Sequence, residues 1–397
     1  MVRRVILGFI CFLFVSSCTY PMMVTSLNYP ELSEHAPIAI NGNEDLTSQA
    51  ANEGWLGTGS EDSPIVIADM KIKSESSGIR IEEVSLYFVI ENCLIEPYEM
   101  ESDPHFGIFI ENCHHASIEM CVVVGYNIGI FLGNADNAYV YRTEIMSSGF
   151  GVFVNESSAV WLHSLDIIVC DIGIRLNHTL YAFIDQTIID YPIESGIECI
   201  KDSGTLLRHN ALYGPQQGVV VAESENWVME ETMIHSCGIG IDMIDVSGGF
   251  VLRSMISNCS LYGINLNTHT TNITTVQCWL GPNNTQNAQD NGVGNHWCED
   301  YSQIGNYWSD FSGEAPYLIP GDAMSLDLYP TSLDDAPDWN DVITGEGAPI
   351  DNTTASSSVT NTDYDSLIST SAMVISFASL VVIMMMVVLM IRSKAGQ

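Results

Sequence analysis

Residues 107–133, GIFIENCHHASIEMCVVVGYNIGIFLG, hold one complete copy of the unit that repeats along most of the chain and the start of the next. Each copy opens with a glycine and a short apolar strand, first at Gly107–Ile110 and then at Gly129–Leu132. The same opening recurs every 22 or 23 residues at Gly151, Gly173, Gly196, Gly218, Gly240 and Gly263, and one irregular unit starts earlier at Gly78. A strand-rich, helix-poor repeat of this length predicts one turn of a parallel β-helix.

The apolar residues of each unit keep a constant distance from its glycine. Eleven positions after the glycine stand Val89, Ile118, Val140, Leu162, Ile184, Leu207, Met229 and Val251. Sixteen positions after it stand Leu94, Val123, Ile145, Ile167, Ile189, Leu212, Ile234 and Ile256. With the residues one and three after each glycine, these side chains would fill a common interior from three short strands per coil.

No run between residues 64 and 282 has the apolar spacing of an amphipathic helix. We therefore predict an all-β fold built on a single parallel β-helix, in preference to a sandwich of scattered strands. Each repeated glycine is expected at a coil corner, where the backbone has a positive φ or where a side chain has no room.

Both ends of the chain are hydrophobic. Residues 1–26 join a basic start to a short apolar core and small residues, which predicts a secretory signal peptide. Residues 371–391 are almost wholly apolar and precede Arg392 and Lys394, which predicts a transmembrane helix and a cytoplasmic tail at 392–397. Residues 336–370, acidic and rich in Ser and Thr, predict a flexible stalk. Lipidation of Cys18 is an alternative anchor.

The charge of the chain is strongly negative. Twelve Lys and Arg residues stand against 49 Asp and Glu residues, a formal net charge of −37 at pH 7. Such a surface repels nucleic acid and anionic lipid and suits solubility, cation-rich surroundings or a cationic partner.

Both ends of the repeat region resemble the flanks of the NosD-type right-handed β-helix proteins. The segments that carry the resemblance are Pro37–Asn43, Gly57–Ser60 and Ser63–Ile67 before the repeats, and Gly294–Trp297, Gly305–Phe311, Ala315–Tyr317 and Asp327–Pro330 after them. The Gly-Asn-Tyr-Trp-Ser-Asp run at 305–310 is fairly specific, whereas the glycine repeats also occur in pectate-lyase-like β-helices. The resemblance implies a right-handed coil and an extracytoplasmic surface protein. We expect an N-terminal cap at 27–64, about ten coils at 65–282 and a C-terminal cap at 283–335.

The family takes its name from an accessory of copper maturation, and copper requires soft ligands such as Cys, Met or His close together. The densest group is Cys113, His114, His115 and Cys121, which a corner loop with solvated histidines and packed cysteines also explains. We predict no metal site and no cofactor.

Cysteines of an exported chain can form disulfides. Cys237 and Cys259 both lie nineteen positions after their glycines, on adjacent coils, and form either a disulfide or part of a row of reduced thiols. Cys278 and Cys298 could link the C-terminal cap.

A charged ladder is expected on the outer face. Twelve positions after successive glycines stand Tyr141, His163, Asp185, Arg208 and Glu230. His163, Asp185, Arg208 and Glu230 are the weak catalytic candidates, since a general base and a cation could act together on a uronate. We favour the alternative that they form a stack of salt bridges.

Aromatic residues form two outward rows. Phe109, Phe131 and Phe153 stand two positions after their glycines, and Tyr139, Trp161 and Phe183 stand ten positions after them. Rings spaced at the coil repeat form an interaction surface when nothing covers them. Ring stacking that only stabilises the solenoid, or a covering segment, would explain the rows equally well.

The function expected is a non-catalytic surface module that contacts polysaccharide or another cell-envelope component and is attached to the cell membrane through the C-terminal helix. A polysaccharide lyase or glycoside hydrolase is the first alternative. A copper-handling accessory protein is the second.

The predicted topology places residues up to about 370 outside the cell and residues 392–397 inside, because positive charge flanks membrane segments on the cytoplasmic side. Protease treatment of intact cells should then release the repeat region into the medium. Digestion of the C-terminal tail while the repeats stay protected would show the opposite orientation.

Overall fold

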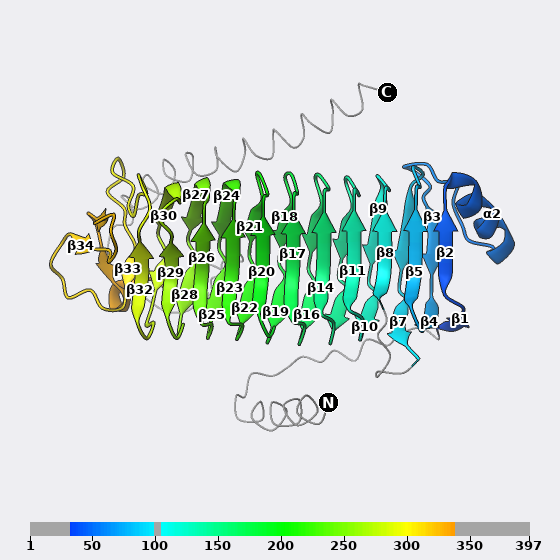
Figure 1. Ribbon diagram of the computed structural model, residues 1–397, viewed down its shortest axis with the longest axis horizontal. Helices are drawn as coiled ribbons and strands as arrows, with labels where there is room; N and C mark the ends of the chain where they lie inside the picture. Colours follow the sequence, from blue (N-terminus) through cyan, green and yellow to red (C-terminus); the bar gives the residue numbers. More distant parts are fainter. Residues whose placement is uncertain (1–31, 99–104, 338–397) are drawn as a thin grey trace, which may run out of the picture.

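The computed structural model describes residues 32–98 and 105–337, which form one elongated solenoid (Figure 1). The predicted signal peptide, transmembrane helix and cytoplasmic tail lie outside these residues, as does nearly all of the stalk. None of the helices in the described ranges is long and apolar enough to cross a membrane.

Three parallel sheets form the sides of the solenoid in the described part of the chain. The thirteen-stranded sheet runs, in spatial order, through β1 (Ser33–His35), β4 (Met70–Ser74), β7 (Leu94–Pro97), β10 (Val122–Val124), β13 (Glu144–Met146), β16 (Asp166–Ile168), β19 (Ile188–Asp190), β22 (Ala211–Tyr213), β25 (Met233–His235), β28 (Met255–Ser257), β31 (Trp279–Leu280), β33 (Tyr307–Trp308) and β36 (Thr331–Ser332).

The eleven-stranded sheet contains the glycines of the repeat. It runs through β2 (Ile38–Asn41), β5 (Ser77–Glu82), β8 (Phe106–Glu111), β11 (Ile128–Gly133), β14 (Phe150–Asn155), β17 (Ile172–Asn177), β20 (Ser195–Ile200), β23 (Gln217–Ala222), β26 (Ile239–Ile244), β29 (Tyr262–Leu266) and β32 (Gln286–Asp290).

The ten-stranded sheet carries the charged ladder. It runs through β3 (Ile65–Ala68), β6 (Phe88–Glu91), β9 (Ala116–Glu119), β12 (Tyr139–Tyr141), β15 (Trp161–His163), β18 (Phe183–Asp185), β21 (Leu206–Arg208), β24 (Glu225–Glu230), β27 (Ser247–Leu252) and β30 (Thr271–Val276).

Neighbouring strands of each sheet come from successive coils, so the chain visits the three sheets in turn and pairs each strand with its equivalent one coil away. This arrangement confirms the all-β parallel β-helix, of the right-handed type expected from the resemblance and with about twelve turns. Parallel pairing also begins before residue 65, at β1 and β2, and continues past residue 282 at β32, β33 and β36.

Each end of the solenoid is covered (Figure 1). At the N-terminal end, helix α2 (Asn43–Glu53) buries Leu46 and Ala50 against the first coil. At the C-terminal end, the antiparallel pair β34 (Tyr317–Leu318) and β35 (Leu326–Asp327) precedes the 3₁₀ turn η2 (Leu333–Asp335). These caps shield strand edges that would otherwise pair with other chains.

The interior follows the predicted register from the second coil onward. The residues one, three, eleven and sixteen positions after the glycines from Gly107 to Gly240 are all buried. The first coil is the exception: Val89 and Leu94 are only partly buried, and Ile90 and Ile95 take the inward positions instead, pairing with Ile118 and Val123. In this irregular first unit the register is shifted by one residue. Because side chains alternate between the two faces of a strand, the shift points Val89 and Leu94 outward.

The repeated glycines lie within strands of the eleven-stranded sheet, and their φ angles are not positive. A Cβ on Gly129 would lie 2.5 Å from Cγ2 of Ile145 and 2.7 Å from the carbonyl oxygen of Gly151. The lack of room therefore explains the glycine, and the expected place at a corner is wrong. The corner positions with a positive φ are occupied mostly by residues other than glycine, such as Asn134, Arg142 and Ser147 of one coil.

The register predicts different costs for two neighbouring substitutions in β19. Ile189→Asn buries an amide in a fully enclosed position and should cost roughly 3–5 kcal/mol of unfolding free energy, because it adds an unpaired polar group and removes apolar contacts. Ile188 is 44% exposed, so Ile188→Asn should cost less than about 1 kcal/mol. Urea unfolding measures both, and equal losses would contradict the register.

Candidate functional site

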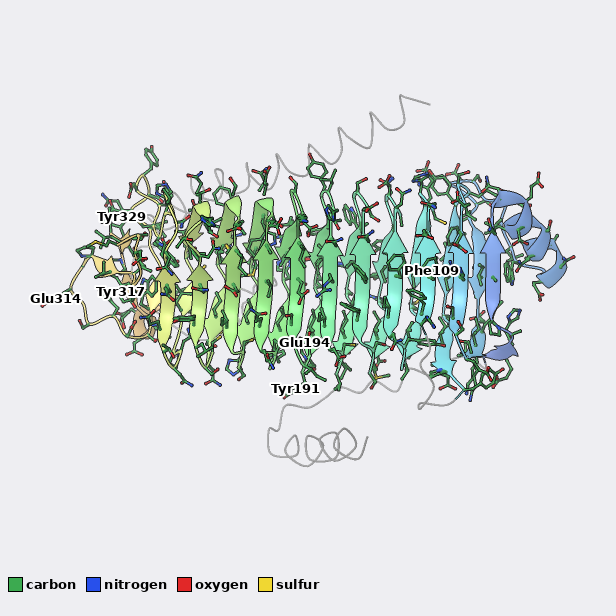
Figure 2. All side chains as sticks on the ribbon, in the orientation of Figure 1. Phe109, Tyr191, Glu194, Glu314, Tyr317 and Tyr329 are labelled. Atoms are coloured by element: carbon green, nitrogen blue, oxygen red, sulfur yellow. The ribbon has the colours of Figure 1, made fainter. Side chains whose placement is uncertain are left out.

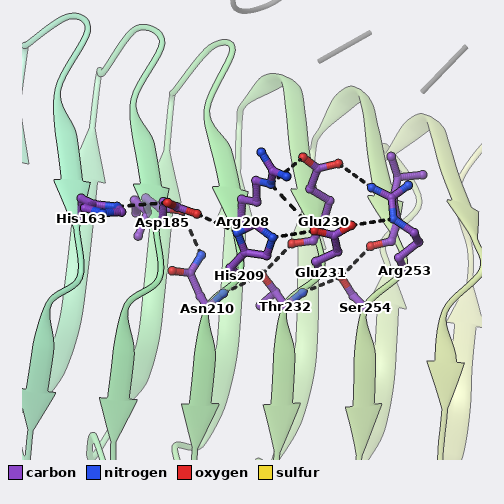
Figure 3. A network of polar contacts seen from close by, with 12 residues as sticks. His163, Asp185, Arg208, His209, Asn210, Glu230, Glu231, Thr232, Arg253 and Ser254 are labelled. Atoms are coloured by element: carbon purple, nitrogen blue, oxygen red, sulfur yellow. Dashed lines mark hydrogen bonds and ion pairs between the residues drawn. The ribbon is translucent and has the colours of Figure 1, made fainter. Parts of the chain in front are cut away.

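The charged ladder lies on the outer face of the ten-stranded sheet, as the spacing predicted (Figure 3). Nδ1 of His163 lies 3.0 Å from Oδ2 of Asp185 on the next coil. Nε of Arg208 lies 3.4 Å from Oε1 of Glu230. The four candidates are thus joined in pairs between coils rather than left free.

Three further residues belong to this network: His209, Glu231 and Arg253. Each lies at the corner that follows the ten-stranded sheet, one position after the ladder position of its coil. His209 bridges Oδ1 of Asp185 at 3.1 Å and Oε2 of Glu231 at 2.6 Å. Arg253 contacts Oε2 of Glu230 at 3.0 Å and Oε1 of Glu231 at 2.9 Å. In the sequence, His209, Glu231 and Arg253 form a second charged row, thirteen positions after their glycines.

The network sets the charges of His209 and Glu231. Hydrogen bonds to Asp185 and Glu231 raise the pKa of His209 to about 9, so this imidazole is protonated at neutral pH. Burial opposes ionisation of Glu231, but its contacts with His209 and Arg253 outweigh burial and lower its pKa to about 2. The three carboxylates are therefore matched by His209 and the two arginines.

This pairing limits what the ladder can do chemically. A general base needs a free lone pair within reach of the proton that it removes. Both ring nitrogens of His209 are engaged. His163 is the better candidate, because Asp185 holds Nδ1 while Nε2 has no hydrogen-bond partner within residues 32–98 and 105–337.

The phenylalanine row lies on the outer face of the eleven-stranded sheet, where Figure 2 labels Phe109. Phe109 is nevertheless only 6% exposed, because Arg80 lies 3.9 Å above its ring and Phe131 stacks on it at 4.9 Å. Phe131 and Phe153 are partly buried and contact each other edge to face. The rings of this row largely cover one another.

The second aromatic row lies beside the charged ladder on the ten-stranded sheet. Tyr139, Trp161 and Phe183 are partly buried neighbours on consecutive coils. Trp161 and Phe183 meet edge to face at 5.2 Å, and Tyr141 stacks on His163 at 5.4 Å. Aromatic rings and the first residues of the ladder thus form one continuous surface.

The copper ligands suggested by the family name do not come together. Cys113 and Cys121 are buried, and burial raises the pKa of the Cys113 thiol to about 11. His114 contacts Asp136 at 3.6 Å, while His115 stacks on Tyr87. Within the described ranges, no group of three or more His, Cys, Asp and Glu side chains could hold a metal ion. These residues do not fit a copper site.

The nine cysteines of the described part are all free thiols. Cys237 and Cys259 are both buried on adjacent coils, where their thiols donate to the backbone carbonyl oxygens of His235 and Ser257 at 3.6 and 3.7 Å. Cys278 donates to the carbonyl oxygen of Val251 at 3.3 Å, and Cys298 lies near Asp300. Neither of the disulfides considered from the sequence is present.

The motif at 305–310 closes the C-terminal end. Asn306 is fully buried and donates to two backbone carbonyls at 2.9 and 2.6 Å. Trp308 Nε1 and the backbone N–H of Asn306 both donate to Oδ2 of the buried Asp327, at 2.9 and 2.8 Å. A Cβ on Gly305 would collide with the same carboxylate. This most specific part of the resemblance therefore has a structural role.

Comparison with known proteins supports the resemblance. Residues 37–205, less than half of the 397-residue chain, match the family described as periplasmic copper-binding protein (NosD). No curated protein matches the sequence.

Among solved structures, similar folds include three polysaccharide-modifying enzymes. An alginate lyase from a Paenibacillus strain has a TM-score of 0.46 and 13% identity, over 65% of this chain and 99% of the lyase. The A-module of a mannuronan C-5 epimerase from Azotobacter vinelandii has a TM-score of 0.45 and 11% identity, over 79% and 99%. The pectate lyase Pel9A has a TM-score of 0.37 and 12% identity, over 76% and 79%. Identities this low concern the fold alone.

The ladder predicts an unusual titration of His209. Its ring should titrate near pH 9 by NMR, whereas His235, whose pKa is lowered by burial, should titrate below 6.5. Because the folded pKa of His209 is raised, its stabilising effect is complete below about pH 6.5 and is lost as the pH rises through about 9. Glu231→Gln should move the His209 midpoint down, and a wild-type midpoint at or below 6.5 would show that the bridges do not form.

Proposed function

We propose that this protein binds polysaccharide along the outer face of the ten-stranded sheet. The observation that carries the proposal is the row of Tyr139, Trp161 and Phe183, three partly exposed aromatic side chains on three successive coils. We call these three residues the aromatic platform.

The spacing of the platform suits a linear polymer. Adjacent coils are about 4.8 Å apart, which is close to the length of one sugar ring along an extended chain. A sugar ring has an apolar face that packs on an aromatic ring, and its hydroxyl groups need hydrogen-bond partners. The platform offers the rings, and the imidazole of His163 and the carboxylate of Glu119 stand on the coils on either side of Tyr141.

The platform is a better binding surface than the phenylalanine row. Phe109 is almost completely covered by Arg80 and neighbouring rings, so a ligand would first have to displace them. The register of the platform continues through Leu206, Val228 and Phe250, of which Leu206 is buried and Phe250 is 38% exposed.

We further propose that the chain displays this surface outside the cell, attached to the membrane by the segment at 371–391. The apolar stretch and the basic residues after it support this anchor. The acidic surface, which keeps proteins soluble and apart, suits a protein displayed in this way.

A second candidate function, open only to a uronate polymer, is β-elimination: Nε2 of His163 would take the proton beside the sugar carboxylate as the C4–O bond to the next sugar breaks. An uncharged ligand would exclude this reaction. The contact of Asp185 with Nδ1 fixes the ring and leaves Nε2 available, two residues from Trp161 on the same strand. A His163→Asn variant that abolishes release of sugar fragments, but still binds the polymer, would establish this enzymatic role.

Replacing the platform tests the proposal. The triple variant Tyr139→Ala, Trp161→Ala and Phe183→Ala should weaken binding of a polysaccharide by roughly a hundredfold, since each ring contributes about 1 kcal/mol beyond its buried area. Binding is measured by affinity electrophoresis against a panel of polysaccharides. The matched control is Phe109→Ala, Phe131→Ala and Phe153→Ala.

The control should leave binding unchanged, because those rings cover one another. Circular dichroism checks that both triple variants keep the solenoid. Unchanged binding by the folded platform variant, with loss in the control, would move the site to the phenylalanine row.

A further inference from the structure

We infer that the polymer bound on the aromatic platform is an uncharged polysaccharide and not a polyuronate. This inference rests on the proposed function and adds the class of ligand. It is carried by the positions and partners of the cationic side chains.

The described ranges contain eight Lys and Arg residues, and seven of them already face a carboxylate of this chain. The pairs are Lys71 and Lys73 with Glu96, Arg80 with Glu82, Arg175 with Glu198, Lys201 with Glu223, Arg208 with Glu230, and Arg253 with Glu230 and Glu231. A carboxylate on a ligand would have to compete with these internal partners.

The cations nearest the platform pair with deeply buried carboxylates, although the Arg208 side chain itself is 39% exposed. Glu230 is 3% exposed and lies between Arg208 and Arg253. The protonated His209 is held between Asp185 and Glu231. Removing one partner from such a buried network leaves the other charge unpaired, which costs several kcal/mol.

Arg142 is the one cation without a carboxylate partner in the part of the chain that the structure describes. It is exposed, and its guanidinium carbon lies 5.0 Å from the ring centroid of Tyr141, at one edge of the platform. A polyuronate carries one carboxylate per sugar. A stretch long enough to cover three coils would therefore bring about three negative charges to a surface with a single free cation.

The rest of the molecule adds to this mismatch. The formal net charge of −37 creates a potential that repels a polyanion and slows its approach. The hydroxyl groups of a neutral sugar are not repelled by this acidic surface, because each can donate a hydrogen bond to a carboxylate. Glu119, a partly exposed residue on β9 beside Tyr141, offers such an acceptor next to the platform. The charge distribution that excludes uronates thus favours neutral sugars.

Binding of the full-length chain to neutral glucans and mannans, and separately to polygalacturonate and alginate, tests the inference. Measurements at about 20 mM and about 0.5 M salt separate the electrostatic contribution. We expect at least one neutral polymer to bind with less than a threefold effect of salt, and polyuronates to bind at least tenfold more weakly. Arg142→Gln should change neutral-polymer binding less than twofold, because this residue lies outside the platform.

The inference would be overturned by a polyuronate that binds more tightly than every neutral polymer. Its affinity would also have to fall at least tenfold in the Arg142→Gln variant or at high salt. If the platform triple variant also fails to bind that polyuronate, the proposed site is correct and only the proposed class of ligand is wrong. If no polymer of either class depends on the platform, the proposed function fails and the inference fails with it.

Discussion

Parallel stacking of equivalent residues is the constraint on which the rest of the molecule depends. Each strand pairs in register with its counterpart one coil away, so a side chain has its own positional equivalent as its nearest neighbour on either side. A position that is apolar in one coil therefore favours an apolar residue in the next. The repeated glycines follow from the same geometry, because each packs against the backbone of the next one.

The same constraint explains why the ladder alternates in charge. Equal charges in adjacent coils would lie about 4.8 Å apart and destabilise the stack. Asp185, Arg208 and Glu230 instead alternate, and the corner residues His209, Glu231 and Arg253 supply the remaining partners. Mutual neutralisation of these charges stabilises this face.

Sequence periodicity predicted the fold and the inner register because stacking repeats the same environment in every coil. Periodicity predicts burial less well at positions where the environment differs from one coil to the next. Val89 and Leu94 were misplaced because the first unit shifts the register by one residue. The burial of Phe109 depends on Arg80 from a coil that breaks the repeat length, so spacing alone could not show it. The corner row that holds His209 was visible in the sequence, but its pairing depends on side-chain geometry.

The most recognisable residues of the sequence close the solenoid and do not form the candidate site. Asn306 and Asp327 satisfy backbone and indole groups that the last coils would otherwise leave buried without partners. Any β-helix that ends in this way needs the same groups, whatever its outer faces bind, so the motif identifies the closure and not the ligand. Specificity must instead come from outward positions that the stacking constraint leaves free to vary. On the ten-stranded sheet these include the positions of the aromatic platform, where we propose that the surrounding charges select the class of polymer.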